Sequence, residues 1–295
     1  MSDSDPLRST TILSITLTVA DGSALAATRF LPTEAAQASI VIGSAMGVPA
    51  GYYKHFATWL ATQGYVVTTF DYRGIGASLD RPLRDHPATL TDWFSQDYPA
   101  AIASAKAHAP ELPLYLLGHS LGGQLPGLLP DVSVSSLAGL LSVATGSGYW
   151  RTTAPTIRNK YPLLAYAIGP VAMRLAGYFP GSKLGIFDDI PGPAMRQWVD
   201  WCKDPRYCAG VEPNAPARFA RVTFPVHYVS FTDDEFMTRQ GTEVMLDEYV
   251  NAARQHTRIA PADWGLTRIG HFGFLRKEMA AHWPRLLPLL AGLHQ

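Results

Sequence analysis

Hydrophobic and polar residues alternate in two stretches near the start of the chain. Apolar side chains occupy every second position over 11–20, and a similar alternation covers 25–31. The Asp21-Gly22 pair between the two stretches suits a tight turn. A period of two interrupted by a turn predicts a β-hairpin of antiparallel strands.

After this hairpin, compact apolar runs typical of buried strands alternate with segments of helical periodicity. The predicted strands are 39–42, 65–70, 114–117, 137–145 and 222–229, and the predicted helices are 52–63, 90–109, 243–254 and 274–293, the last kinked at Pro284. Such β-α-β alternation predicts an α/β fold with a mostly parallel sheet, covered by helices on both faces.

The alternation stops between residues 149 and 218. This stretch has no clear strand pattern, but it has many aromatic residues and short helical pieces separated by Pro and Gly. We interpret 149–218 as a helical cap, or lid, inserted into a core formed by 1–148 and 219–295. Its aromatic and aliphatic residues suit either the cap's own core or an apolar pocket: Trp150, Tyr161, Leu163, Leu164, Tyr166, Trp198 and Trp201.

Composition narrows the range of partners. The 295 residues include 47% hydrophobic and 16% charged residues, and 24 basic residues balance 24 acidic ones. This balance gives no electrostatic reason to expect nucleic acid or an anionic membrane as a partner. The polar N-terminus and the lack of a long apolar run predict a cytoplasmic protein without stable membrane insertion, acting on a small molecule.

The two cysteines, Cys202 and Cys208, have no histidine close by in sequence. A zinc site needs further ligands, so we expect buried free thiols.

The segment Gly118-His119-Ser120-Leu121-Gly122-Gly123 follows the apolar run 114–117 and matches the pattern G-x-S-x-G. When this pattern joins a strand to a helix, the serine lies on a sharp, strained turn that exposes its hydroxyl. A plain glycine-rich turn is the alternative. The preceding strand and the second glycine favour Ser120 as a nucleophile.

A serine hydroxyl needs a base to accept its proton, and the base needs a carboxylate to orient it. In the fold that carries this motif the order along the chain is Ser, acid, His. His271 fits best, because it lies in a glycine-flanked loop before the last predicted helix; His256, His282 and His294 are the alternatives.

The acid is expected just after the strand that ends near Ser230. Asp233, Asp234 and Glu235 all lie there. Asp234 suits the geometry best, and Asp233 or Glu235 are the alternatives. Two backbone amides are needed for the oxyanion, and we expect them from Leu121 and from Met46 in the loop after 39–42.

The serine motif, the candidate acid and histidine, and the loop after 39–42 together resemble the α/β-hydrolase superfamily. Within it they resemble the serine aminopeptidase and monoglyceride lipase branch. Residues 44–53 are similar to the family's His-Gly oxyanion loop, 70–78 to its strand-end block, and 118–123 to its nucleophile elbow. The resemblance implies a catalytic triad of Ser120, Asp234 and His271, and no cofactor or metal.

Some features depart from that family or have a simpler explanation. Ser44-Ala45 replaces His-Gly in the oxyanion loop, and Pro126 should shorten or kink the helix after the elbow. In the family the Asp-x-Arg-Gly segment is structural, so we expect Asp71 and Arg73 to form a charge pair that fixes their loop.

The sequence therefore predicts a serine hydrolase that cleaves a carboxylic ester or related compound with an apolar acyl group. A lactone hydrolase using the same triad is one alternative. A non-hydrolytic binding protein is another, because this fold also carries such proteins. A nucleotide-binding protein is disfavoured, since no dinucleotide fingerprint or P-loop follows a predicted strand.

Overall fold

The computed structural model describes residues 10–185 and 187–294, and over these it contains one eight-stranded sheet in the order β1-β2-β4-β3-β5-β6-β7-β8. Strands β1 and β2 form the predicted hairpin, and β2 also pairs antiparallel with β4. All other pairs are parallel. The strands are β1 (Thr11–Thr18), β2 (Ala24–Leu31), β3 (Ala38–Gly43), β4 (Tyr65–Phe70), β5 (Leu114–His119), β6 (Gly139–Val143), β7 (Val226–Phe231) and β8 (Arg254–Ile259). The predicted α/β fold is confirmed.

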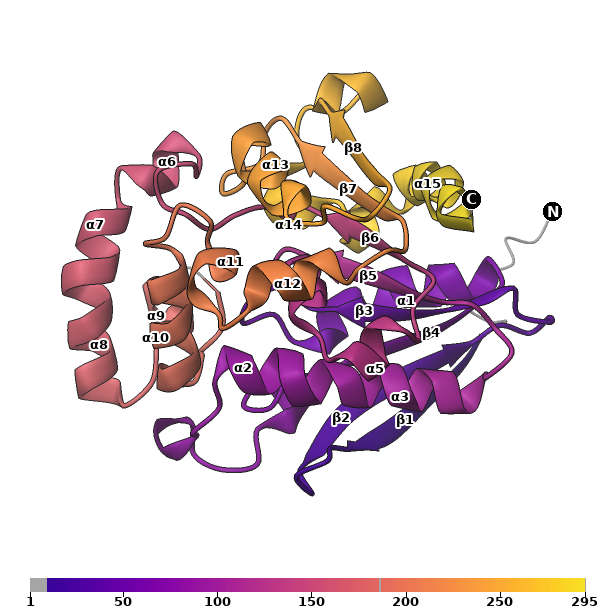
Figure 1. Cartoon of the computed structure of the whole chain (residues 1–295), viewed down its shortest axis with the longest axis horizontal. Coiled ribbons are helices and arrows are strands. Elements are labelled where there is room, and N and C mark those ends of the chain that lie inside the picture. The colour runs from indigo at the N-terminus through magenta and orange to yellow at the C-terminus, as the bar shows by residue number, and fades with distance from the viewer. Residues whose placement is uncertain (1–9, 186, 295) are drawn as a thin grey trace.

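Most helices outside the predicted cap alternate with the strands (Figure 1). They are α1 (Lys54–Thr62), α2 (Leu90–Asp92), α3 (Tyr98–His108), α4 (Leu121–Gln124), α5 (Asp131–Val134), α13 (Arg239–Asp247), α14 (Gly270–Gly273) and α15 (Leu287–Ala291). A π-helical turn at Trp93–Asp97 joins α2 to α3, so the helix predicted over 90–109 is confirmed.

Each face of the sheet carries its own hydrophobic core. Leu116 and Leu117 are neighbours on β5, yet Leu116 packs into one core and Leu117 into the other. Consecutive side chains of a strand point to opposite faces, so both faces of β5 are buried. This explains why the central strands are continuous apolar runs rather than alternating ones.

Seven short helices lie between β6 and β7 in the described part of the chain. They are α6 (Pro155–Arg158), α7 (Tyr161–Leu163), α8 (Gly169–Ala176), α9 (Gly181–Leu184), α10 (Gly192–Trp201), α11 (Cys208–Val211) and α12 (Ala215–Ala220). We call residues 149–218 the cap segment. Figure 1 shows α6 to α10 beyond one end of the sheet, on the side away from the chain termini. That the cap segment acts as a lid stays a prediction.

Two helices predicted near the C-terminus are present, but one differs in its bounds and the other in its helix type. The helix expected over 243–254 is α13, which begins at Arg239 after a Thr238 N-cap and ends at Asp247, and the chain then forms β8. The single helix expected over 274–293 is instead a run of 3₁₀ turns at Lys277–Leu286 followed by α15. Pro284 removes a backbone donor within that segment, which is incompatible with a regular α-helix there.

The helix after the elbow is short, as predicted from Pro126. Helix α4 covers only Leu121–Gln124, and a 3₁₀ turn at Leu125–Leu128 follows it. The proline ring cannot be accommodated beyond the first turn of an α-helix.

Candidate active site

Ser120 is the single residue between the end of β5 and the start of α4. Its backbone angles are φ 51° and ψ −114°, which a residue with a side chain rarely adopts. Such strain persists only when the surrounding structure enforces it. The strand, sharp turn and helix predicted around Ser120 are therefore confirmed.

The elbow glycines let three segments approach closely. A Cβ atom on Gly118 would overlap the backbone of Gly123, and one on Gly122 would overlap the carbonyl group of Gly43 at the end of β3. A Cβ atom on Gly123 would overlap the Ser142 hydroxyl of β6. The turn thus fits against both strands that flank β5, which fixes the position of Ser120.

Ser120, His271 and Asp234 form a continuous hydrogen-bonded series. The Ser120 Oγ atom lies 3.0 Å from His271 Nε2, and His271 Nδ1 lies 2.9 Å from Asp234 Oδ2. Asp234 Oδ1 also accepts hydrogen bonds of 2.8 Å from the Phe236 and Met237 amides, which fixes the carboxylate. The structure brings the three predicted residues together, and each is at most 7% exposed.

The alternative histidines lie elsewhere. His256 is in β8, where its Nε2 atom lies 2.7 Å from the Ser230 hydroxyl. His282 stacks on Trp264. The side chain of His294 lies outside the described residues.

The two predicted oxyanion amides belong to residues that follow neighbouring strands, Met46 in the loop after β3 and Leu121 at the start of α4. Gly43 of β3 and Gly118 of β5 are register partners, and Met46 and Leu121 each lie three positions further along the chain. Within the described residues, neither amide has an assigned hydrogen-bond acceptor. That these two amides form an oxyanion hole stays a prediction.

Comparisons with known proteins agree with this arrangement. The family described as "Serine aminopeptidase, S33" matches residues 34–174. A monoacylglycerol lipase from Mycolicibacterium smegmatis is 33% identical over 84 residues, which are 28% of this chain and 29% of that protein. The chain thus matches less than a third of that relative's length.

Solved structures extend the similarity to the whole fold. A soluble variant of monoglyceride lipase from Saccharomyces cerevisiae superimposes with a TM-score of 0.66 at 14% identity, covering 97% of this chain and 96% of that one. A carboxyl esterase from Bacillus coagulans gives a TM-score of 0.59 at 14% identity, and the match covers 97% of this chain and 99% of that one. The chain therefore has the predicted α/β-hydrolase fold. It is similar to the serine aminopeptidase and monoglyceride lipase branch, as predicted.

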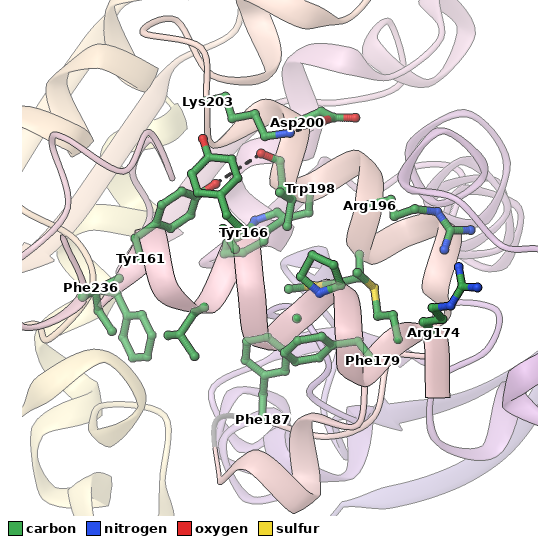
Figure 2. A pocket seen from close by; sticks show the side chains of 18 residues that line it. Tyr161, Tyr166, Arg174, Phe179, Phe187, Arg196, Trp198, Asp200, Lys203 and Phe236 are labelled. Carbon is green, nitrogen blue, oxygen red and sulfur yellow. Dashed lines mark hydrogen bonds and ion pairs between the residues drawn. The ribbon is translucent and has the colours of Figure 1, made fainter. Parts of the chain in front are cut away.

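An apolar pocket of about 640 Å³ lies in the cap segment (Figure 2). Helices α7, α8 and α10 supply much of its lining. Phe236 also lines the pocket, and its ring centroid lies 4.8 Å from that of His271. This side chain therefore lies between the pocket and the Ser120–His271 pair.

The cap residues predicted for such a pocket divide into two groups. Tyr161, Leu164, Tyr166 and Trp198 line it. The other three do not: Trp150 stacks on Tyr161 from outside the lining, Leu163 is 60% exposed, and Trp201 is buried and donates to Glu212. The aromatic content of the cap thus serves both its own core and a pocket.

His119, the residue before Ser120, connects the oxyanion loop to His271. Its Nε2 atom donates to the His271 carbonyl oxygen at 3.0 Å, so its Nδ1 atom accepts from the Tyr53 hydroxyl at 2.8 Å. The Tyr53 oxygen in turn accepts from the Ala45 amide at 2.9 Å. Sequence reasoning missed Tyr53, because a contact over 66 positions leaves no local pattern.

Burial makes His119 a source of pH-dependent stability. Burial, followed by the electrostatic effect of the His271 side chain, lowers the pKa of His119 to about 3, against an ordinary value of 6.5. Below pH 6.5 the unfolded chain therefore binds a proton that the folded chain does not. The free energy of unfolding consequently decreases as the pH is lowered. Replacing His119 by glutamine should reduce the drop in unfolding free energy between pH 7.5 and 5.5 by about 1.4 kcal/mol.

Urea unfolding of both proteins at the two pH values measures this difference. An equal drop in the wild type and in His119→Gln would show that His119 can be protonated in the folded state.

The predicted Asp71–Arg73 charge pair was wrong. Arg73 pairs with Asp21 and Asp97, with nitrogen-oxygen distances of 2.7 Å to each. Asp71 instead accepts hydrogen bonds from two backbone amides. Both residues still fix the loop, as expected, but through partners other than each other.

Other parts of the described chain give no further reactive group. Cys202 and Cys208 are buried and free, as predicted, and burial raises the pKa of both thiols. The described residues contain no cluster of three or more His, Cys, Asp or Glu side chains placed to hold a metal ion. None of the described helices combines the length and hydrophobicity needed to cross a membrane.

Proposed function

We propose that the chain is a serine hydrolase that cleaves carboxylic esters with an apolar acyl group. The observation that carries this proposal is the hydrogen-bonded series from Asp234 through His271 to Ser120 at a strained elbow. The similarity of residues 34–174 to the serine aminopeptidase family and of 84 residues to a monoacylglycerol lipase supports it.

In the proposed mechanism the Ser120 oxygen attacks the ester carbonyl carbon while His271 Nε2 accepts the serine proton. Asp234 holds Nδ1 of the imidazole and stabilises the imidazolium that forms. The Met46 and Leu121 amides donate to the oxyanion of the tetrahedral intermediate. His271 then protonates the leaving alcohol, and an acyl-enzyme remains on Ser120.

Water hydrolyses the acyl-enzyme with the same groups. His271 accepts a proton from the water molecule as its oxygen attacks the acyl carbon, and then returns the proton to Ser120. The carboxylic acid leaves, and the enzyme regains its starting state. Each step uses side chains and amides of this chain alone.

A fluorophosphonate probe tests whether the serine is reactive. We expect stoichiometric labelling of the wild type at Ser120 and none in Ser120→Ala, because only an activated hydroxyl attacks the phosphorus atom. Intact-mass spectrometry and peptide mapping measure this. A folded wild-type protein that stays unlabelled would contradict the proposal and favour the non-hydrolytic binding protein.

The apolar pocket predicts a preference for acyl chains of at least moderate length. Nitrophenyl decanoate should give a higher kcat/KM than nitrophenyl acetate, since each buried methylene contributes about 0.8 kcal/mol. Acylated lactones in the same screen test the lactonase alternative. Activity on acetyl esters alone would contradict an acyl site in this pocket.

A matched pair of variants tests the location of the acyl chain. Met173 lines the pocket, whereas Val171 on the same helix is 58% exposed and lies outside the lining. Met173→Trp should lower kcat/KM for the decanoate ester by about 10-fold while sparing the acetate ester, because it fills space needed by the chain. Val171→Trp should change neither, and equal effects of the two variants would place the chain elsewhere.

A further inference from the structure

Three consecutive acidic residues, 233–235, meet three consecutive residues of the His271 loop, 269–271. Only Asp234 contacts the His271 ring. Asp233 Oδ2 accepts hydrogen bonds from the Ile269 amide at 2.8 Å and from the Gly270 amide at 3.0 Å. The backbone immediately before His271 is thereby fixed to the end of β7.

Glu235 binds the next amide of the same loop. Its Oε2 atom accepts from the His271 amide at 2.8 Å, and its other oxygen pairs with Arg268. Burial raises the pKa of Glu235, but the His271 amide and Arg268 outweigh this, and the pKa lies below its ordinary value of 4.5. Glu235 is therefore charged at neutral pH, and hydrogen bonds to a charged acceptor are the stronger kind.

Gly270 shows how closely these segments fit. Its φ is +66°, and a Cβ atom there would lie 3.0 Å from both carboxylate oxygens of Glu235. Both conditions favour glycine over other residues. The loop thus has a conformation that lets its amides reach the two flanking carboxylates.

We propose that Asp233 and Glu235 are positioning residues for His271, and that they hold its Nε2 atom at attacking distance from Ser120. The inference rests on the proposed function, in which His271 is the base. With these bonds, the His271 amide is bound by Glu235, its carbonyl by His119 and its ring by Asp234.

The test compares Asp233→Ala and Glu235→Ala in two backgrounds, the wild type and His271→Ala. In the wild-type background we expect each to lower kcat for a nitrophenyl ester by about 10- to 100-fold, because a displaced base is costly. KM should change by less than about twofold, since neither side chain lines the acyl pocket. In the His271→Ala background the same substitutions should cause no further loss, because no imidazole remains to be positioned.

A purely structural role gives a different result. It would lower activity by the same factor in both backgrounds, or would leave kcat unchanged while lowering stability, and either outcome overturns the proposal. Glu243→Ala is the matched control, because Glu243 is an acidic residue of α13 that pairs with exposed Arg239. It should leave kcat as in the wild type.

Glu235→Gln provides a variant that keeps an acceptor oxygen, in case Glu235→Ala does not fold. We expect its kcat to lie between those of the wild type and Glu235→Ala, because a neutral acceptor binds the His271 amide more weakly. A loss in Glu235→Gln as large as in Glu235→Ala would contradict a role through this hydrogen bond.

Failure of the proposed function is distinguishable from failure of this inference. If His271→Ala retains wild-type activity, the proposed function fails. If His271→Ala is inactive but Asp233→Ala and Glu235→Ala have wild-type kcat, the positioning proposal alone fails.

Discussion

Replacing Ser120 by alanine is expected to lower kcat for ester hydrolysis by on the order of 10⁶-fold, because the attacking oxygen is removed. The remaining oxyanion donors should leave only weak catalysis above the rate in water. Initial rates with a nitrophenyl ester at high enzyme concentration measure the loss. Ser135→Ala, which alters an exposed serine directly after α5, is the control and should retain wild-type activity.

The same position predicts a trade-off between activity and stability. Ser120 has a φ of 51°, which glycine adopts without strain. Ser120→Gly should therefore be as inactive as Ser120→Ala, yet more stable than the wild type by about 1 kcal/mol. Urea unfolding measures this difference. Equal or lower stability of Ser120→Gly would mean that the elbow is not strained, and substantial activity in either variant would exclude Ser120 as the nucleophile.

The elbow and its partners were predictable because their signals are local. A glycine pattern after an apolar run identifies Ser120, and the order Ser, acid, His selects from the remaining chain. The structure places Asp234 and His271 at Ser120, where the sequence expected them. What the sequence left open was the choice within 233–235. The structure shows that the other two carboxylates bind backbone amides instead of the ring.

Strand β8 could not be predicted from its own residues. Arg254–Ile259 is polar, and all but its last residue are exposed or half-buried. It lies at the edge of the sheet, where one neighbour, β7, decides its conformation. Strand propensity depends on such neighbours more than on the residue itself, so the polar residues 254–259 predict no strand.

Charge pairs were equally hard to assign. Asp71 and Arg73 are two positions apart, which made a pair between them the simplest expectation. Arg73 instead reaches Asp21 in the hairpin turn and Asp97 in the π-helical turn. The fold brings these acids to Arg73 from positions that sequence spacing does not connect. The Tyr53–His119 contact was missed for the same reason.

Replacing Gly122 by alanine is expected to lower the free energy of unfolding by about 3 kcal/mol or more. Its Cβ atom would overlap the carbonyl group of Gly43, which is backbone of β3. Gly43 is paired with Gly118 of β5, so β3 cannot move away without disturbing the centre of the sheet. The displacement would also shift the Leu121 amide relative to the Met46 loop, and activity should fall further than stability alone explains.

Gly51→Ala separates this packing effect from a general cost of replacing glycine. Nothing lies within 4 Å of a Cβ atom on Gly51, and its φ is not positive. Its stability should therefore stay within about 0.5 kcal/mol of the wild type, as for most surface substitutions. Urea unfolding and nitrophenyl ester hydrolysis of both variants measure the two effects. Similar stability of Gly122→Ala and Gly51→Ala would mean that the elbow is not packed against β3, and the position of Ser120 would then need another cause.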